Sequence, residues 1–431
     1  MKAGINELMD TLRKGRVHYE DYDVAVLVGM ILKDMALGLE GKGSSLEMIP
    51  TYVGPAQNIP VGEPVIVLDA GGTNLRSALV RFDSSGEPHV EHLVKRTMPG
   101  VEAEVDNAGF FDALADSLGE VAGKSDRIGF CFSYAMSMQP DLDGRLIRIC
   151  KEIKARGIDG RLVGGELIEA MRRRGLGRQW KVTVLNDSVA ALMAGTQPSF
   201  RPRGSYAAFI LGTGMNACYL ESNIPKLGGP VAPQVVVLEA GGFDCPLRGE
   251  VDAAFDRTTA DPGFYTYEKM FSGGYLGPLA LHVLKYLAHQ GFFTFRQRTA
   301  ILAAGGLETA DIAAFHARPL DGTLPFRRVL AMEDEDDIEM AHAAIDVLVE
   351  RASRLAASVM AAAAIKTRSG YDISSAVAIT VEGSTYHSFE DLRARCEAHL
   401  YSLLTTRMGI RYYLVSMPDA VLVGSAIAGL L

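Results

Sequence analysis

A unit of two apolar segments joined by a glycine turn occurs twice in this sequence, and it constrains the fold more than any other feature. The first copy, "VIVLDAGGTNLRSALVRF", covers residues 65–82, and the second, "SYAAFILGTGMNACYLE", covers residues 205–221. In both copies a strand-like run ends at a glycine turn and a second strand-like run follows. Two copies about 140 residues apart indicate a duplicated architecture.

The rest of the chain mixes predicted strands with predicted helices, which is typical of an α/β protein. Apolar residues at helical spacing predict helices over residues 5–38, 163–174, 268–290 and 337–366. Strands are expected over 127–133, 181–185, 376–381 and 410–416, with an extended segment at 45–53 and a short apolar helix at the end. Because 431 residues exceed one ordinary core, two domains are expected.

Composition excludes several classes of protein. The net charge of −9 argues against a nucleic-acid surface. Five scattered cysteines, with no Cys-x-x-Cys pair, fit a reduced compartment better than a disulfide framework. The N-terminus lacks the apolar core of a signal peptide, and the longest apolar run, residues 355–365, is too short to span a bilayer. We therefore expect a cytoplasmic protein with no nucleic-acid or membrane partner.

The first glycine turn combines a carboxylate with groups that bind anions. Gly71 and Gly72 let the backbone approach a ligand closely, and Thr73 and Asn74 add hydrogen-bond donors. Asp69 would repel a bare phosphate, but it suits a phosphate that carries Mg²⁺, which prefers carboxylate, water and phosphate oxygens. A tight hairpin with no ligand is the alternative for this turn taken alone.

The second glycine turn favours the nucleotide interpretation of the first. Gly212, Thr213 and Gly214 stand in the corresponding place, and two facing hairpins can hold one polyphosphate between them. Neither turn has the Gly-Lys-Ser/Thr of a P-loop, and neither opens a helix as the Rossmann fingerprint requires.

A third candidate lies where a predicted strand becomes a helix, in "VTVLNDSVAALMAG". Asn186 and Asp187 stand at this junction. An aspartate in such a place is commonly a helix N-cap. Kinases, however, need a carboxylate that accepts the proton of the attacking hydroxyl, and α/β sites gather at the carboxyl ends of strands.

Taken together, these segments resemble the eukaryotic-type hexokinase family, within the actin-like and heat-shock-70-like ATPase superfamily. "LDAGGTNLR" resembles its first phosphate motif, "FSYAMSMQPDLDGRLIRICKEI" its sugar-binding stretch, "LNDSVAALMA" its catalytic segment and "LGTGMNACYLE" its second phosphate motif. "VLEAGGF", "DPGFYTYEKMFSGGYLG" and "VEGSTY" are similar to its remaining sugar and adenosine segments. The resemblance runs nearly end to end.

The resemblance implies roles for individual residues. Asp187 would be the general base. The sugar would be bound by Ser133, Cys150, Lys151, Asn186, Asp187, Asn216, Glu239 and Glu268. The nucleotide would be bound by Asp69, Gly71, Gly72, Thr73, Asn74, Arg76, Gly212, Thr213, Gly214, Gly383 and Ser384. ATP would carry the Mg²⁺, near Asp69, with no direct protein ligand.

The resemblance also implies the architecture, a two-lobed actin-like ATPase fold, duplicated from a ribonuclease-H-like unit, with a central cleft. The small lobe would comprise residues 62–198 plus 416–431, and the large lobe residues 1–61 plus 199–415. Monomer and homodimer both stay open.

Several positions depart from the family pattern. Cys150 stands where the family has threonine, and a thiol is a weak donor, so one hydrogen bond to the sugar is expected to be weaker. Ala135 replaces a common proline, Met138 a common glutamine and Ala240 a tryptophan. "DAVLVGSA" lacks the family's Gly-Ser-Gly turn. These changes affect the sugar site more than the phosphate motifs.

The resemblance implies an ATP-dependent hexokinase that phosphorylates the 6-hydroxyl of a hexose, with glucose expected, at the entry to glycolysis. A related kinase for mannose, fructose or an amino sugar is one alternative. A weakly catalytic sugar sensor is another, although a pure sensor could lose Asp187. An actin-like polymer or chaperone ATPase is a third, and the sugar ring of Asn186, Glu239 and Glu268 argues against it.

Overall fold

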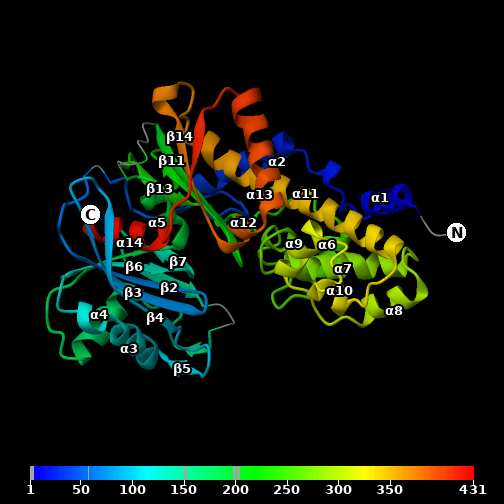
Figure 1. The fold of residues 1–431 in the computed structure, drawn as a ribbon. Helices are drawn as coiled ribbons and strands as arrows, with labels where there is room; N and C mark the ends of the chain where they lie inside the picture. The colour runs from blue at the N-terminus through cyan, green and yellow to red at the C-terminus, as the bar shows by residue number, and fades with distance from the viewer. Residues whose placement is uncertain (1–3, 57, 150–152, 198–199, 201–203) are drawn as a thin grey trace.

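Two β-sheets organise the protein, and two helices lie between them (Figure 1). The computed structural model describes residues 4–56, 58–149, 153–197, 200 and 204–431. Cys150 and Lys151 of the expected sugar set therefore lie outside the described residues.

The five-stranded sheet has the order β10-β6-β2-β3-β4. Its strands are β2 (Val65–Gly71), β3 (Asn74–Phe82), β4 (Pro88–Thr97), β6 (Arg127–Phe132) and β10 (Lys181–Leu185). β2, β3 and β4 form an antiparallel meander, and β6 and β10 extend it in parallel from β2.

The six-stranded sheet repeats this topology in the order β1-β13-β12-β11-β14-β15. Its strands are β1 (Ile49–Pro50), β11 (Ser205–Leu211), β12 (Met215–Glu221), β13 (Gln234–Val237), β14 (Val377–Glu382) and β15 (Tyr412–Val415). β11, β12 and β13 form the meander, and β14 and β15 extend it in parallel from β11. The duplication predicted from the two glycine turns is confirmed, because each turn joins the first two strands of its meander.

The helices α5 (Asp187–Ala194) and α14 (Ala420–Leu430) lie between the sheets (Figure 1). They approach each other closely because α14 carries glycine at the contact. A Cβ on Gly424 would lie 1.7 Å from the carbonyl oxygen of Ala190 in α5. A Cβ on Gly129 of β6 would lie 1.8 Å from the carbonyl oxygen of Ser425. The first contact joins α14 to α5 and the second joins α14 to β6, so α14 ties α5 to the five-stranded sheet.

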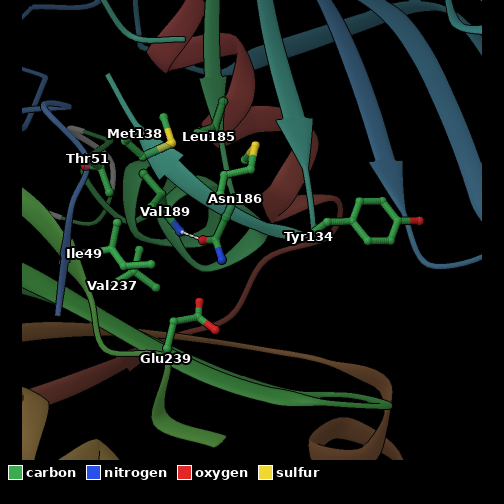
Figure 2. Close-up of a pocket in the computed structure, with 10 residues that line it drawn as sticks. Ile49, Thr51, Tyr134, Met138, Leu185, Asn186, Val189, Val237 and Glu239 are labelled. Carbon is green, nitrogen blue, oxygen red and sulfur yellow. Dashed lines mark hydrogen bonds between the residues drawn. The ribbon is translucent and has the colours of Figure 1, made fainter. Parts of the chain in front are cut away.

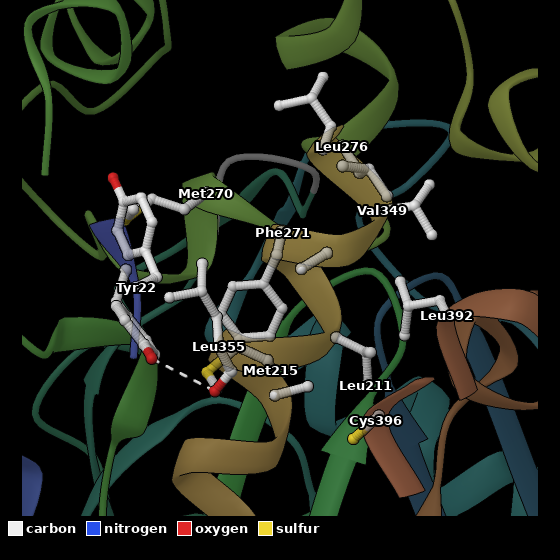
Figure 3. Close-up of a cluster of buried hydrophobic side chains, with 14 of the residues drawn as sticks. Tyr22, Leu211, Met215, Met270, Phe271, Leu276, Val349, Leu355, Leu392 and Cys396 are labelled. Atoms are coloured by element: carbon white, nitrogen blue, oxygen red, sulfur yellow. Dashed lines mark hydrogen bonds between the residues drawn. The ribbon is translucent and has the colours of Figure 1, made fainter. Parts of the chain in front are cut away.

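Three buried clusters fill the remaining space. One lies between the five-stranded sheet and the helices α3 (Asn107–Leu118) and α4 (Val163–Arg173). A second joins the two sheets through α5 and α14. The largest surrounds the 32-residue helix α11 (Glu335–Lys366), and Figure 3 shows part of it, with Leu355 of α11 beside Met215 and Phe271.

The remaining elements lie mostly around α11. The helices are α1 (Ile5–Lys14), α2 (Val24–Leu39), α6 (Glu250–Asp256), α7 (Leu276–His289), α8 (Phe295–Ala303), α9 (Thr309–Ala317), α10 (Pro325–Val329), α12 (Ser384–Ser388) and α13 (Glu390–Tyr401). Two small two-stranded sheets pair β5 (Val105–Asp106) with β9 (Ala155–Arg156), and β7 (Ala135–Met138) with β8 (Gly144–Arg148).

Two helix predictions need correction. The helix expected over residues 5–38 is two helices, because Gly15 ends α1 and Asp23 starts α2 by accepting from the Val26 amide at 2.9 Å. The helix expected over 268–290 begins at Leu276, after a 3₁₀ turn over Glu268–Met270 and two glycines. The division into lobes at 62–198 plus 416–431 stays a prediction.

We expect opposite effects from two helical Gly→Ala substitutions. Gly424→Ala should lower the free energy of unfolding by about 1–3 kcal/mol, because the added methyl group overlaps the α5 backbone. Gly29→Ala in α2 has nothing within 4 Å and should raise it by about 0.5–1 kcal/mol. Chemical denaturation of both variants measures this. Equal effects would contradict the close contact of α5 with α14.

Candidate active site

The junction of β10 and α5 carries two polar side chains with separate tasks. The Asn186 Oδ1 accepts hydrogen bonds from the Val189 amide at 3.1 Å and from the Ser188 Oγ at 2.7 Å, so Asn186 is the N-cap of α5. Asp187 is the first helical residue, and its Oδ1 accepts only from the Ser188 amide among the bonds that the structure shows, at 2.8 Å. The alternative interpretation of Asp187 as the helix cap is therefore wrong.

Asp187 sits in surroundings that disfavour its charge. Desolvation by the surrounding protein raises its pKa to about 6, the nearby Asp69 carboxylate adds to the rise, and the Ser188 amide opposes it. The thiol of Cys131, at the end of β6, is fully buried near both carboxylates. Burial and these two charges raise the pKa of Cys131, so the thiol stays protonated between them.

Glu239 and Asn216 approach from the other sheet. The Asn216 Nδ2 donates to the Glu239 Oε1 at 2.8 Å, and the Asn216 Oδ1 accepts from the Ala217 amide. Glu239 has a left-handed backbone, with φ of 55°, a conformation that clusters at functional sites. Desolvation raises its pKa to about 7, the Asn216 hydrogen bond opposes the rise, and Asp187 and Glu268 add to it.

Glu268 is positioned by the second glycine turn. Its Oε2 accepts from the Met215 amide at 2.8 Å. A Cβ on Gly214 would lie 2.8 Å from this oxygen, and a Cβ on Gly241 would lie 3.1 Å from the Glu268 Cβ. Glycine at both places therefore makes room for this carboxylate next to Glu239.

A pocket opens between the two sheets beside these groups (Figure 2). Glu239 and Asn186 point toward each other across it. Its wall is otherwise largely apolar and comes from both sheets; it comprises Ile49, Thr51, Tyr134, Met136, Met138, Leu185, Val189 and Val237. Met138, which departs from the family pattern, is thus part of this wall.

Ser133 lies at the base of the first glycine turn. A Cβ on Gly71 would lie 3.3 Å from the Ser133 Oγ, and the Tyr134 hydroxyl donates to the Gly72 carbonyl at 3.0 Å. Gly72 has φ of 53°, which lets two residues close the hairpin between β2 and β3. Thr73 and Asn74 are exposed at its tip.

Arg76 bridges two carboxylates at this turn. Its Nε donates to the Asp69 Oδ2 at 2.8 Å, and its Nη1 donates to Asp419 at the start of α14 at 2.9 Å. Burial raises the pKa of Asp69, and the Arg76 guanidinium opposes the rise. The sequence expectation placed Arg76 at the phosphates and did not include Asp419, which stands where the family's Gly-Ser-Gly turn is missing.

The second glycine turn is supported by residues that the sequence analysis missed. The Gly212 carbonyl accepts from the Gly273 amide at 2.9 Å and from the Thr385 Oγ1 at 3.0 Å. A Cβ on Gly273 would lie 2.0 Å from that threonine oxygen. Gly383, with φ of 110°, lies beside Gly212, and Ser384 is exposed at the start of α12. The Gly-Gly pair at 273–274 is the sequence feature that could have indicated this close contact.

Comparison with known proteins identifies the family. Hexokinase family models match residues 13–197 and residues 206–431. The chain belongs to the hexokinase family.

Several curated hexokinases match most of the chain. Hexokinase-7 of Oryza sativa subsp. japonica is 30% identical, over 86% of this chain and 85% of the relative. Hexokinase-1 of Schizosaccharomyces pombe is 27% identical, over 93% of this chain and 86% of the relative. Hexokinase-3 of Homo sapiens is 28% identical over 88% of this chain, which spans only 42% of that relative's length. The mouse and rat hexokinase-3 proteins are likewise matched over only 41% and 40% of their lengths.

Solved structures confirm the fold. Hexokinase from Schistosoma mansoni complexed with glucose has a TM-score of 0.78 and 24% identity, and covers 99% of this chain and 100% of that one. A second hexokinase crystal structure has a TM-score of 0.72 and 22% identity, and the match covers 100% of this chain and 96% of that one. The expected actin-like ATPase fold is thus confirmed. Within the described part of the chain, every helix is too short or too polar to cross a bilayer.

The two residues at the β10–α5 junction should respond oppositely to alanine substitution. Asn186→Ala removes the helix cap and should lower the free energy of unfolding by about 1 kcal/mol. Asp187→Ala should raise the free energy of unfolding at pH 7. Folding raises the pKa of the Asp187 carboxyl, so this carboxyl lowers the stability of the wild-type protein once the pH rises through that pKa. Denaturation at pH 7 and pH 4 tests this, and the gain from Asp187→Ala should shrink at pH 4. A loss of stability at pH 7 would contradict the assigned environment.

Proposed function

We propose that this protein is an ATP-dependent hexokinase that phosphorylates the 6-hydroxyl of a hexose, with glucose as the expected substrate. One observation carries the proposal. A carboxyl whose pKa is raised to about 6, Asp187, lies near Asp69 of the first glycine hairpin and near Glu239, whose neighbour Glu268 is held by the second hairpin. The relative from Schistosoma mansoni was solved with glucose, which supports the choice of hexose.

The hydrogen-bonding groups suit a hexose. Sugar hydroxyls both donate and accept, so carboxylates and amides can hold each of them. The Asn186 Oδ1 is engaged by α5, which leaves its amide nitrogen as the donor toward the cavity. Glu239 and Glu268 supply acceptors from the other sheet. We assign Ser133, Asn216, Cys150 and Lys151 to the same site.

Asp187 is assigned as the general base. A base works best when its pKa lies close to the working pH. With a pKa of about 6, Asp187 is mostly ionised near neutral pH yet more basic than an ordinary aspartate. It accepts the proton of the 6-hydroxyl as the oxygen attacks the γ-phosphorus of ATP. The bond from the γ-phosphorus to the bridging oxygen breaks, and ADP leaves.

The two glycine hairpins are assigned to the phosphates. The exposed Thr73 and Asn74 would bind from one side, and Thr213 and Gly214 from the other. Asp69 fits an indirect role toward Mg²⁺, because Arg76 already occupies its Oδ2 at 2.8 Å. When bound with ATP, Mg²⁺ supplies charge neutralisation for the transferred phosphoryl group. Gly383 and Ser384 are assigned to the adenosine side.

We further propose that the two sheets mark two lobes, with boundaries at 62–198 plus 416–431 and at 1–61 plus 199–415. The assigned sugar groups come from both sheets, so a bound hexose favours closure by its contacts to both. Closure excludes water, which would otherwise accept the phosphoryl group. We also propose a cytoplasmic location, which the four buried free thiols in the described part of the chain support. The proposed assembly is a monomer or a homodimer.

A coupled assay across a panel of hexoses with ATP and Mg²⁺ tests the proposal. Glucose should be phosphorylated, and Asp187→Ala should lower kcat by about 10²–10⁴-fold while glucose binding is largely kept. Ser188→Ala, which removes the Ser188 Oγ hydrogen bond to the Asn186 cap, is the matched control for damage to α5. An Asp187→Ala protein with more than about a tenth of wild-type turnover would be incompatible with a general base at this position. A wild-type protein that phosphorylates none of the hexoses would overturn the function itself.

A further inference from the structure

One contact joins the two halves of the molecule outside the groups assigned above. The Arg148 guanidinium lies over the Phe264 ring, 5.6 Å from its centroid. Arg148 ends β8, whose hairpin partner β7 packs into the core of the five-stranded sheet through Met136. Phe264 belongs to the loop before Glu268, and its neighbour Tyr267 packs into the core around α11. The contact therefore links two separate cores.

Phe264 is unusual for a large apolar side chain. It is 59% exposed and belongs to none of the buried clusters. The loop that carries Phe264 is held in place by buried contacts, and these keep the ring at the surface. The side chains of Lys269 and Asp256 are only 3% and 9% exposed and form an ion pair at 2.6 Å, and the Gly263 amide donates to the same Asp256 at 2.9 Å.

The backbone next to Phe264 is also held in a restricted conformation. Tyr265 has φ of 48°, which is uncommon for a residue with a side chain. Its ring packs at Gly241, where a Cβ would lie 3.3 Å from the Tyr265 Cδ1. Tyr265 therefore turns toward the Glu239–Glu268 side of the site while Phe264 turns outward to Arg148.

Both ends of the contact are tied to the sugar site by short chain segments. Phe264 precedes Glu268 by four residues, and Arg148 pairs across the β7–β8 hairpin with Ala135, two residues after the assigned Ser133. A movement that separates the two halves must break the Arg148–Phe264 contact, and re-forming it brings these segments together.

We propose that Arg148 and Phe264 are positioning residues that latch the two halves of the protein over the bound hexose. The inference rests on the proposed hexokinase activity for the identity of the ligand, and on the Arg148–Phe264 geometry for the latch itself. A cation–π contact at an exposed site favours the latched state about two- to five-fold. The latch thus retains the sugar and does not take part in the proton or phosphoryl transfer.

A double-mutant cycle tests the latch. Arg148→Met removes the charge and Phe264→Leu removes the aromatic ring, while both keep apolar bulk. Calorimetry with glucose should show about two- to five-fold weaker binding in each single variant, and no further weakening in the double variant. kcat and the free energy of unfolding should stay near wild type. Independent, additive effects, or an unchanged glucose affinity, would overturn the proposal.

The chain offers a matched control and a readout that needs no sugar. Arg354 lies over Tyr19 at 4.8 Å, on the α11 side alone, so Arg354→Met with Tyr19→Leu should leave glucose affinity unchanged. Solution scattering of the sugar-free protein should show a larger radius of gyration for Phe264→Leu than for Tyr19→Leu. That difference would uphold the latch even if no hexose were bound, in which case only the proposed function fails. Equal radii would overturn the latch.

Discussion

Backbone contact between α5 and α14 determines where the assigned catalytic carboxylate stands. Gly424 lets α14 meet the carbonyl of Ala190, and Gly129 lets β6 meet the carbonyl of Ser425. With no side chains at these points, the start of α5 is held at a fixed depth between the sheets. The Cys218 thiol donates to the Ser188 carbonyl at 3.0 Å, which ties the same turn to β12. The first turn of α5 is thus held from two sides, by α14 and by β12.

This placement gives Asp187 its chemistry and carries a thermodynamic penalty. A carboxylate close to Asp69 and largely removed from water is harder to ionise, which raises its pKa to about 6. The helix itself is capped by Asn186, so the charge of Asp187 is not needed to hold α5. The elevated pKa suits the proton transfer proposed for Asp187, and it lowers the stability of the folded protein at neutral pH.

Much of this arrangement follows from the sequence, and the reasons can be stated for individual residues. The glycine turns and the Asp187 junction are local, since each interrupts an apolar run with a few residues of distinctive chemistry. Their pairing across two sheets follows from the duplication. The strand β4 was not predicted because it is an exposed edge strand with no buried face and many charged residues. The break between α1 and α2 was hidden because apolar residues continue on both sides of it.

Contacts between distant residues could not be predicted in this way. Arg76 pairs with Asp419, 343 residues away, and nothing local to Arg76 distinguishes it from a solvated arginine that would reach a phosphate. Asn186 and Asp187 are adjacent in the sequence, and both residue types are common helix caps. Only the side-chain geometry shows that Asn186 caps α5. The support of Gly212 by Gly273 and Thr385 likewise depends on how three segments meet.

The pH dependence of kcat/KM for glucose distinguishes a general base at Asp187 from a carboxyl with no part in the reaction, because it reports the essential ionisations of the enzyme before the sugar binds. If Asp187 is the general base and Glu239 is a sugar acceptor, both must lose protons for activity, and their pKa values are raised to about 6 and about 7. We expect kcat/KM to fall as the pH is lowered through this range, with two coupled ionisations in the wild-type protein. The Glu239→Gln variant should show a single ionisation near pH 6. A kcat/KM that stays constant between about pH 5 and pH 8 would contradict it.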